Sequence, residues 1–158
     1  MYLDRVILSP GGVIETANGT DIVTANAAGT GANVLASIFP KITVTAMTTS
    51  ATITTAAILG GQITANQGAA GAATYTMPTG TVLQAALPST FVVGDAVEFV
   101  ITNISTNAAE DVTVAGATGT TMKGNVTVAS NDAVTTVSWG KFRAVKTGTN
   151  TFDVYRVG

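Results

Sequence analysis

The chain has 158 residues and a mass of 15.8 kDa, which is the size of one ordinary domain. It carries 7 Lys and Arg against 9 Asp and Glu, and only 10% of its residues are charged, against roughly 25% in a typical soluble domain. So few cations exclude a basic patch that neutralises several phosphates, and we expect no nucleic-acid partner. The chain has no Cys and no His. Disulfides, Cys/His zinc sites, cysteine nucleophiles and His-based triads are therefore excluded, and we expect neither a cofactor, a metal nor an enzymatic activity.

The composition favours an all-β fold with a thin core. Thr, Val, Ala and Gly dominate the sequence, and β-branched side chains pack well on a pleated sheet. Ala and Gly contribute little volume, and aromatic residues make up only 6% of the chain.

Residues 1–60 consist of short apolar pieces between turn signals such as Pro10-Gly11-Gly12. The pieces are residues 6–8, 13–14 and 34–39; alternation predicts a strand over 42–47, and residues 52–55 can form another. Two interpretations remain open: edge strands of the domain, or an extended arm that docks on a neighbouring subunit. Residues 6–8 are too short for a signal peptide, and no apolar run approaches a membrane helix, so we expect no membrane association.

Residues 61–73 are dominated by Gly and Ala. Such a composition offers no side chain large enough to anchor a core, so we predict a flexible connection here. This connection separates residues 1–60 from a β-rich module over residues 74–158.

The module shows regular short strands. Alternation predicts strands over 74–77 and 97–102, with a short helix over 80–87 that Thr79 caps and Pro88 ends. Further strands are expected over residues 112–115, 122–128, 134–139, 142–145 and 152–157. About seven strands with frequent turns indicate an antiparallel β-sandwich of jelly-roll or immunoglobulin-like type. We expect sequential antiparallel pairing because no crossover helices separate the later strands.

Trp139, Lys141 and Arg143 form the nearest approach to a binding patch. Strand alternation places all three on one face with Phe142 and Val145 opposed, unless Gly140 breaks the register. An aromatic ring beside basic residues can stack on a base or a sugar. The favoured interpretation is a Trp packed at the rim of the sandwich with the Lys and Arg stems over it.

Two groups of carboxylates are candidates for acid–base chemistry or for binding a cation. Glu110 and Asp111 are the one adjacent acidic pair, and we interpret them as a solvated loop because neighbours on a strand point to opposite faces. Asp95 is expected in a turn, and Glu98 is expected to face solvent from its strand.

Six segments follow one another in a familiar order: Thr74–Thr79, Leu87-Pro88, Val93–Asn103, Val112–Gly116, Gly119–Met122 and Gly124–Val128. In this order they resemble C-terminal β-modules of tailed-bacteriophage structural proteins. That group includes capsid decoration (cement) proteins and head or tail fibres. The resemblance covers roughly residues 74–157 and supplies no catalytic residues.

The resemblance implies a non-enzymatic virion protein, made in the host cytoplasm, that binds the outer capsid surface and stabilises the shell. It further implies the major capsid protein as partner and a homotrimer as assembly. The alternative is a fibre head that binds a receptor or glycan through Trp139, Tyr155 and loop residues. A small hydrolase is disfavoured because the chain lacks a nucleophile–base pair.

Overall fold

The computed structural model describes residues 13–15, 21–24, 42–68, 70–132 and 138–158. The chain divides into two units, Met1–Lys41 and Ile42–Gly158. In the first unit, β1 (Val13–Glu15) pairs antiparallel with β2 (Asp21–Thr24). The apolar pieces predicted at residues 6–8 and 34–39 lie outside the described residues.

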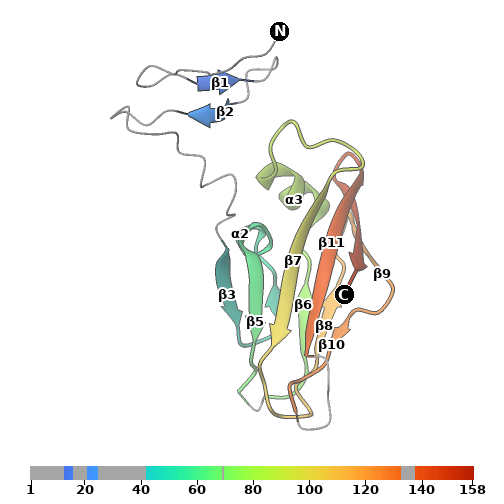
Figure 1. The fold of residues 1–158 in the computed structure, drawn as a ribbon. Coiled ribbons are helices and arrows are strands. Elements are labelled where there is room, and N and C mark those ends of the chain that lie inside the picture. The colour runs from blue at the N-terminus through green and yellow to red at the C-terminus, as the bar shows by residue number, and fades with distance from the viewer. Residues whose placement is uncertain (1–12, 16–20, 25–41, 69, 133–137) are drawn as a thin grey trace. The chain divides into compact units, whose positions relative to one another are not determined.

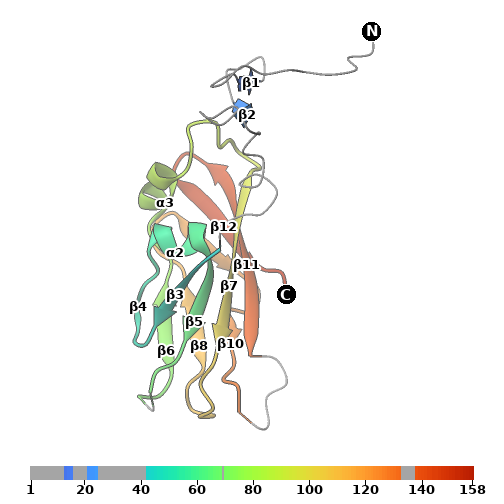
Figure 2. The ribbon, with the colours of Figure 1, turned by 60° about the vertical axis from the view of Figure 1, so that its left-hand side comes forward.

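The second unit, called the β-unit below, contains two sheets (Figures 1 and 2). The larger has the order β3-β5-β7-β11-β12-β9 and the smaller the order β10-β8-β6-β4. The strands of the larger sheet are β3 (Thr43–Met47), β5 (Gly61–Ala65), β7 (Ala96–Asn103), β11 (Trp139–Gly148), β12 (Thr151–Arg156) and β9 (Thr120–Lys123). Those of the smaller sheet are β10 (Thr127–Val128), β8 (Val112–Ala115), β6 (Ala73–Thr76) and β4 (Ala51–Thr52).

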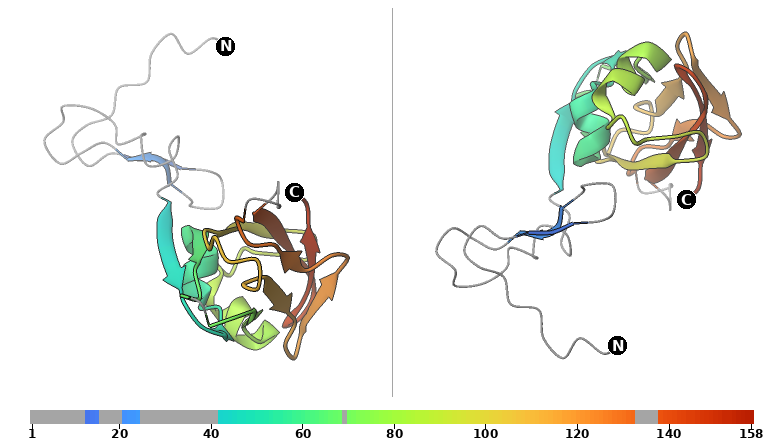
Figure 3. Two further views of the ribbon diagram at one scale, coloured as in Figure 1. Left: turned by 90° about the horizontal axis from the view of Figure 1, so that it is seen from below. Right: turned by 90° about the horizontal axis from the view of Figure 1, so that it is seen from above.

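Two short helices, α2 (Thr55–Gly60) and α3 (Gly80–Ala86), contact each other near one end of the β-unit (Figure 3). Thr54 accepts a hydrogen bond from the Ala57 N–H at 3.1 Å, and Thr79 caps α3 in the same manner through Val82 N–H. The helix predicted over 80–87 with its Thr79 cap is thus confirmed. Helix α2 was not predicted, because residues 52–55 read as a continuing strand.

The chain crosses from one sheet to the other at every step from β3 to β11. In five cases strands two apart in sequence become neighbours, and a strand of the opposite sheet lies in the connection between them. Among these neighbours β3–β5, β4–β6, β5–β7 and β6–β8 are parallel, and β8–β10 is antiparallel. Of the remaining neighbours, β12–β9 is parallel, and β7–β11 and β11–β12 are antiparallel. The prediction of a mostly β fold is confirmed. The prediction of purely antiparallel pairing is wrong, because strands of the opposite sheet and the helices α2 and α3 carry the chain back between parallel neighbours.

Both sheets and both helices contribute to one cluster of buried residues. Phe99 of β7 and Phe142 of β11 stack in it with ring centroids 5.5 Å apart, and Tyr75 of β6 and Phe152 of β12 are also fully buried. The aliphatic members include Ile53, Ile58, Ile63, Leu83, Ile101, Val112, Val128 and Val154. The cluster holds the two sheets together as one body.

The predicted boundary at 61–73 is wrong. Residues 61–65 form β5, a strand between β3 and β7, in which Ile63 and Ala65 are fully buried. Ile63 is the large side chain that anchors this segment in the core, although Gly and Ala dominate residues 61–73. Just before β5, Gly60 at the end of α2 packs against β3, where a Cβ would lie 2.8 Å from the Thr43 carbonyl oxygen. Residues 42–60 belong to the same unit, with β3 and β4 at sheet edges, so the edge-strand interpretation holds for them.

Two strand predictions need correction, and a third lies largely outside the described residues. Residues 122–128 form two strands, β9 and β10, which lie in different sheets. Residues 139–148 form one strand, because Gly140 keeps the register with Ile101 and does not interrupt it. Of the strand predicted over 134–139, residues 134–137 lie outside the described part of the chain.

Among the described glycines, Gly80 lies closest to neighbouring backbone. A Cβ built at Gly80 would lie 1.9 Å from the Asn150 carbonyl oxygen and 2.8 Å from that of Gly119. We expect Gly80→Ala to lower the free energy of unfolding by about 3 kcal/mol, since backbone must move to admit the methyl group. Thr81→Ala, at an exposed position of the same helix, is the matched control, and urea denaturation compares them. A Gly80→Ala protein as stable as the control would contradict this packing.

Candidate functional site

The outer face of the six-stranded sheet carries the residues singled out from the sequence. Pairing register places Val44, Gln62, Val100 and Lys141 opposite one another across β3, β5, β7 and β11. The same register aligns a second row over β7, β11, β12 and β9, made of Glu98, Arg143, Tyr155 and Lys123. Inward neighbours on these strands, such as Phe99 and Phe142, are buried, so the rows face away from the core.

Glu98 bridges the two basic residues of the predicted patch. Its carboxylate accepts from Arg143 Nε at 2.7 Å and lies 2.5 Å from Lys141 Nζ. Hydrogen bonds from Lys141, which has the larger effect, and from Arg143 lower the pKa of Glu98 below its ordinary value of 4.5. Further along the sheet, Lys123 Nζ lies 3.5 Å from Asp153 Oδ2. Most of the charge on this face is therefore neutralised within the face itself.

Trp139 stands at the end of the face beside the C-terminal residues. Its side chain is 45% exposed, and its ring edge lies against Gly158, where an added Cβ would approach it to 3.1 Å. Arg156 donates to the carbonyl oxygens of Trp139, Thr127 and Gly158. These bonds fix the backbone around the indole and leave much of the ring open to solvent.

The prediction that Trp139, Lys141 and Arg143 share a face is confirmed. Val145 was expected on the opposite face with Phe142, but it lies on the outer side of β11 and pairs with Asp153. The charged ends of Lys141 and Arg143 form ion pairs with Glu98, which the interpretation of their stems as lying over Trp139 did not include. Sequence reasoning did not link Glu98 to this patch, although its strand was identified, because pairing between β7 and β11 joins residues 45 positions apart.

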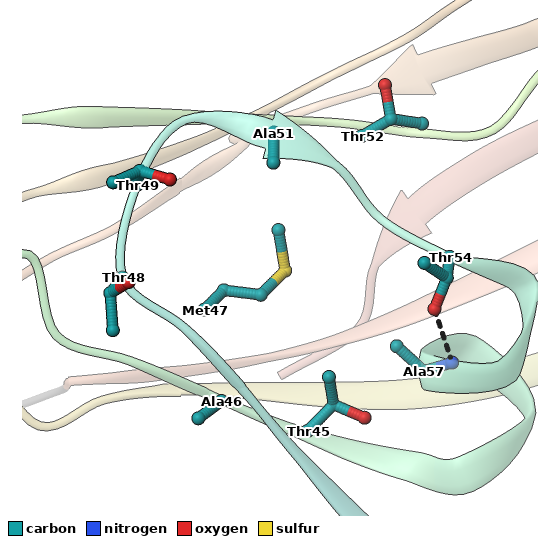
Figure 4. A pocket seen from close by; sticks show the side chains of 9 residues that line it. All are labelled: Thr45, Ala46, Met47, Thr48, Thr49, Ala51, Thr52, Thr54 and Ala57. Carbon is teal, nitrogen blue, oxygen red and sulfur yellow. Dashed lines mark hydrogen bonds between the residues drawn. The ribbon is translucent and has the colours of Figure 1, made fainter.

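A pocket of about 300 Å³ opens between the edge strands β3 and β4 (Figure 4). Met47 points into its middle, and uncharged side chains surround it: Thr45, Ala46, Thr48, Thr49, Ala51, Thr52, Thr54 and Ala57. We call it the edge pocket. Its lining offers hydroxyls and small apolar groups but no acid, base or nucleophile pair.

The interpretation of Glu110 as part of a solvated loop is wrong, because its side chain is fully buried. Glu110 Oε2 accepts from the Gln67 backbone N–H at 3.2 Å, and the Gln67 amide donates to Tyr75 Oη at 3.0 Å. Tyr75 in turn donates to the Met47 carbonyl oxygen at 2.7 Å. This chain of bonds ties the loop after β5 to β3 and β6, so its role is structural. Asp111 accepts from the Ser130 N–H at 3.0 Å.

A scan of protein-family models, a search of curated proteins and a search of solved structures each found no match to this chain. Within the described ranges, no three or more Asp or Glu side chains gather as a metal-binding group. Neither helix of the part that the structure describes is long and apolar enough to cross a bilayer.

The Glu98 ion pairs predict an acid-sensitive contribution to stability. Because the folded-state pKa is below 4.5, this contribution is present above pH 4.5 and is lost as the pH falls through the folded value. We expect Glu98→Gln to lower Tm slightly at pH 7 and in low salt, with the difference disappearing in acid. Thermal melts of both proteins from pH 7 to pH 3 measure it. A Tm difference that stays constant over this range would contradict the ion pairs.

The buried Tyr75 predicts a contribution to stability that is lost at alkaline pH. Burial raises the pKa of Tyr75 above 10.0, partly offset by the Gln67 hydrogen bond, so its contribution is present below pH 10 and is lost as the pH rises beyond it. Tyr75→Phe should lower the free energy of unfolding by about 1–3 kcal/mol at pH 7, because Gln67 Nε2 loses its acceptor. It should also reduce the loss of stability above pH 10, because the ionisable hydroxyl is gone. Tyr155→Phe, on the exposed face, is the control. Equal stabilities of the two variants in urea at pH 7 would refute the buried network.

Proposed function

We propose that this chain is a non-enzymatic structural protein of a tailed-phage virion, which decorates the outer capsid surface through the outer face of its six-stranded sheet. The β-unit would then be a sandwich variant in which the two sheets share one core. The exposed aromatic and apolar groups on the outer face carry the proposal. Trp139 is 45% exposed, Tyr155 41% and Val157 43%.

The chemistry of this face supports a protein partner. Aromatic residues and Arg are enriched at interface cores and among the residues that dominate binding energy. Pairing of Lys141 and Arg143 with Glu98 means that docking would cover few free charges and so would incur a low desolvation cost. The sequence resemblance over residues 74–157 suggests that this partner is a capsid shell.

A glycan-binding fibre head is the second candidate, and the exposure of Trp139 favours it. A half-exposed indole can serve as a stacking platform for a sugar ring. Direct hydrogen bonding to that sugar would need a donor or acceptor near Trp139 that is not already engaged. Lys141 and Arg143 are engaged with Glu98, so this candidate ranks below a protein partner.

The test is co-sedimentation with empty capsids assembled from the major capsid protein encoded in the same genome. Trp139→Ala should weaken binding about 30-fold, as expected for truncating an exposed aromatic anchor. Val82→Ala is the matched control, because Val82 is an exposed apolar residue on α3, outside this face.

Three outcomes decide between the candidates. Binding that Trp139→Ala weakens and Val82→Ala leaves intact supports decoration. Absence of capsid binding by the wild-type chain overturns it. If the wild-type chain does not bind capsids and an oligosaccharide from a test panel quenches its Trp139 fluorescence, the fibre-head alternative is established.

A further inference from the structure

The four edge strands of the two sheets differ in how they are protected against pairing with another chain. β4 and β10 have only two residues each. β9 ends at Lys123, whose ammonium group is paired with Asp153. Short length and charged side chains are the usual protections of a sheet edge. β3 has neither, because its five residues read Thr-Val-Thr-Ala-Met.

The hydrogen-bonding pattern shows which residues of β3 face the open edge. Met47 C=O accepts from the Asn66 N–H at 3.2 Å, on the β5 side. Successive residues of a strand direct their N–H and C=O groups to opposite sides. Thr43, Thr45 and Met47 therefore bond to β5, and Val44 and Ala46 point their backbone groups away from it. No other described strand pairs with this side of β3.

The side chains at this edge are apolar and exposed. Val44 is 60% exposed and the preceding Ile42 58%. Thr45, Ala46 and Met47 also line the edge pocket, which opens beside the same strand (Figure 4). An extended chain placed along β3 would satisfy the outward backbone groups of the strand and would cover this apolar surface.

We propose that β3 pairs antiparallel with β3 of a second copy of this chain, about a two-fold axis at Thr45. In this register Val44 of each copy lies opposite Ala46 of the other, and these residues exchange backbone hydrogen bonds through their outward groups. The side chains brought together are those of Val, Ala, Thr and Met, so no charge is buried and no like charges meet.

A second copy fits this edge better than an unrelated partner. The five-residue segment is uncharged and complementary to itself in reverse, which is what a two-fold contact between identical chains requires. The low charge of the whole chain, with a formal net charge of −2, adds little repulsion between copies. The contact closes with two copies, so it predicts a dimer in place of the trimer that the resemblance implies.

The experiment uses the full chain and measures its mass by light scattering on a sizing column. Val44→Pro removes one outward N–H without touching the bonds to β5, and proline is tolerated at an edge position of this kind. Val44→Lys introduces the charge with which natural edges are protected, at an exposed position. Val44→Thr keeps both the N–H and the branched shape, and serves as the control.

The wild type and Val44→Thr should elute as dimers of twice 15.8 kDa, and the other two variants should dissociate at least about 10-fold more readily. Near-UV circular dichroism checks that each variant is folded; if Val44→Pro is not, Val44→Lys decides. A wild-type monomer up to about 1 mM, a trimer, or a dimer unaffected by folded variants would each overturn the proposal.

Discussion

Phe99 and Phe142 stack at 5.5 Å on adjacent strands of the larger sheet, and Tyr75 of the smaller sheet is buried in the same core. In a chain with 6% aromatic residues, these rings with Phe152 supply much of the volume that joins the two layers. Toward β3 and β4 the lining changes to Thr, Ala and Met, and there the edge pocket opens. The scarcity of large side chains thus explains both where the core is tight and where it is open.

The positions of the strands in the sequence could be predicted far better than the order in which the strands pair within the sheets. Alternation of Val97, Phe99 and Ile101 reports which side of β7 is buried, and the structure agrees for this strand. Nothing in that alternation reports that β5 lies beside β7 in parallel, because the connection runs through β6 in the other sheet. The Gly/Ala content of residues 61–73 hid β5 because a composition averaged over the segment outweighs one residue, Ile63, whose side chain is fully buried in the core.

In the candidate site, too, features set by one strand could be predicted, and features set by residues far apart in sequence could not. Trp139, Lys141 and Arg143 share a face because they alternate on one strand, which the sequence displays directly. Their carboxylate partner comes from β7, and the buried position of Glu110 depends on the Gln67 backbone, 43 residues away. Such long-range pairings leave no periodic signal in one sequence, so ion pairs and buried polar bonds were beyond prediction.

The outer face and the open edge of β3 belong to one sheet, and this links the two proposals physically. Val44 lies in the same cross-strand row as Lys141, with Gln62 and Val100 between them. A second copy paired at β3 would continue these rows into its own sheet, so two outer faces would lie on one continuous surface. A partner whose own binding sites repeat at that spacing would then engage both faces, and the second contact would benefit from a raised effective concentration. A weakly charged face can thus bind tightly without strong individual contacts, provided that the edge pairing is specific.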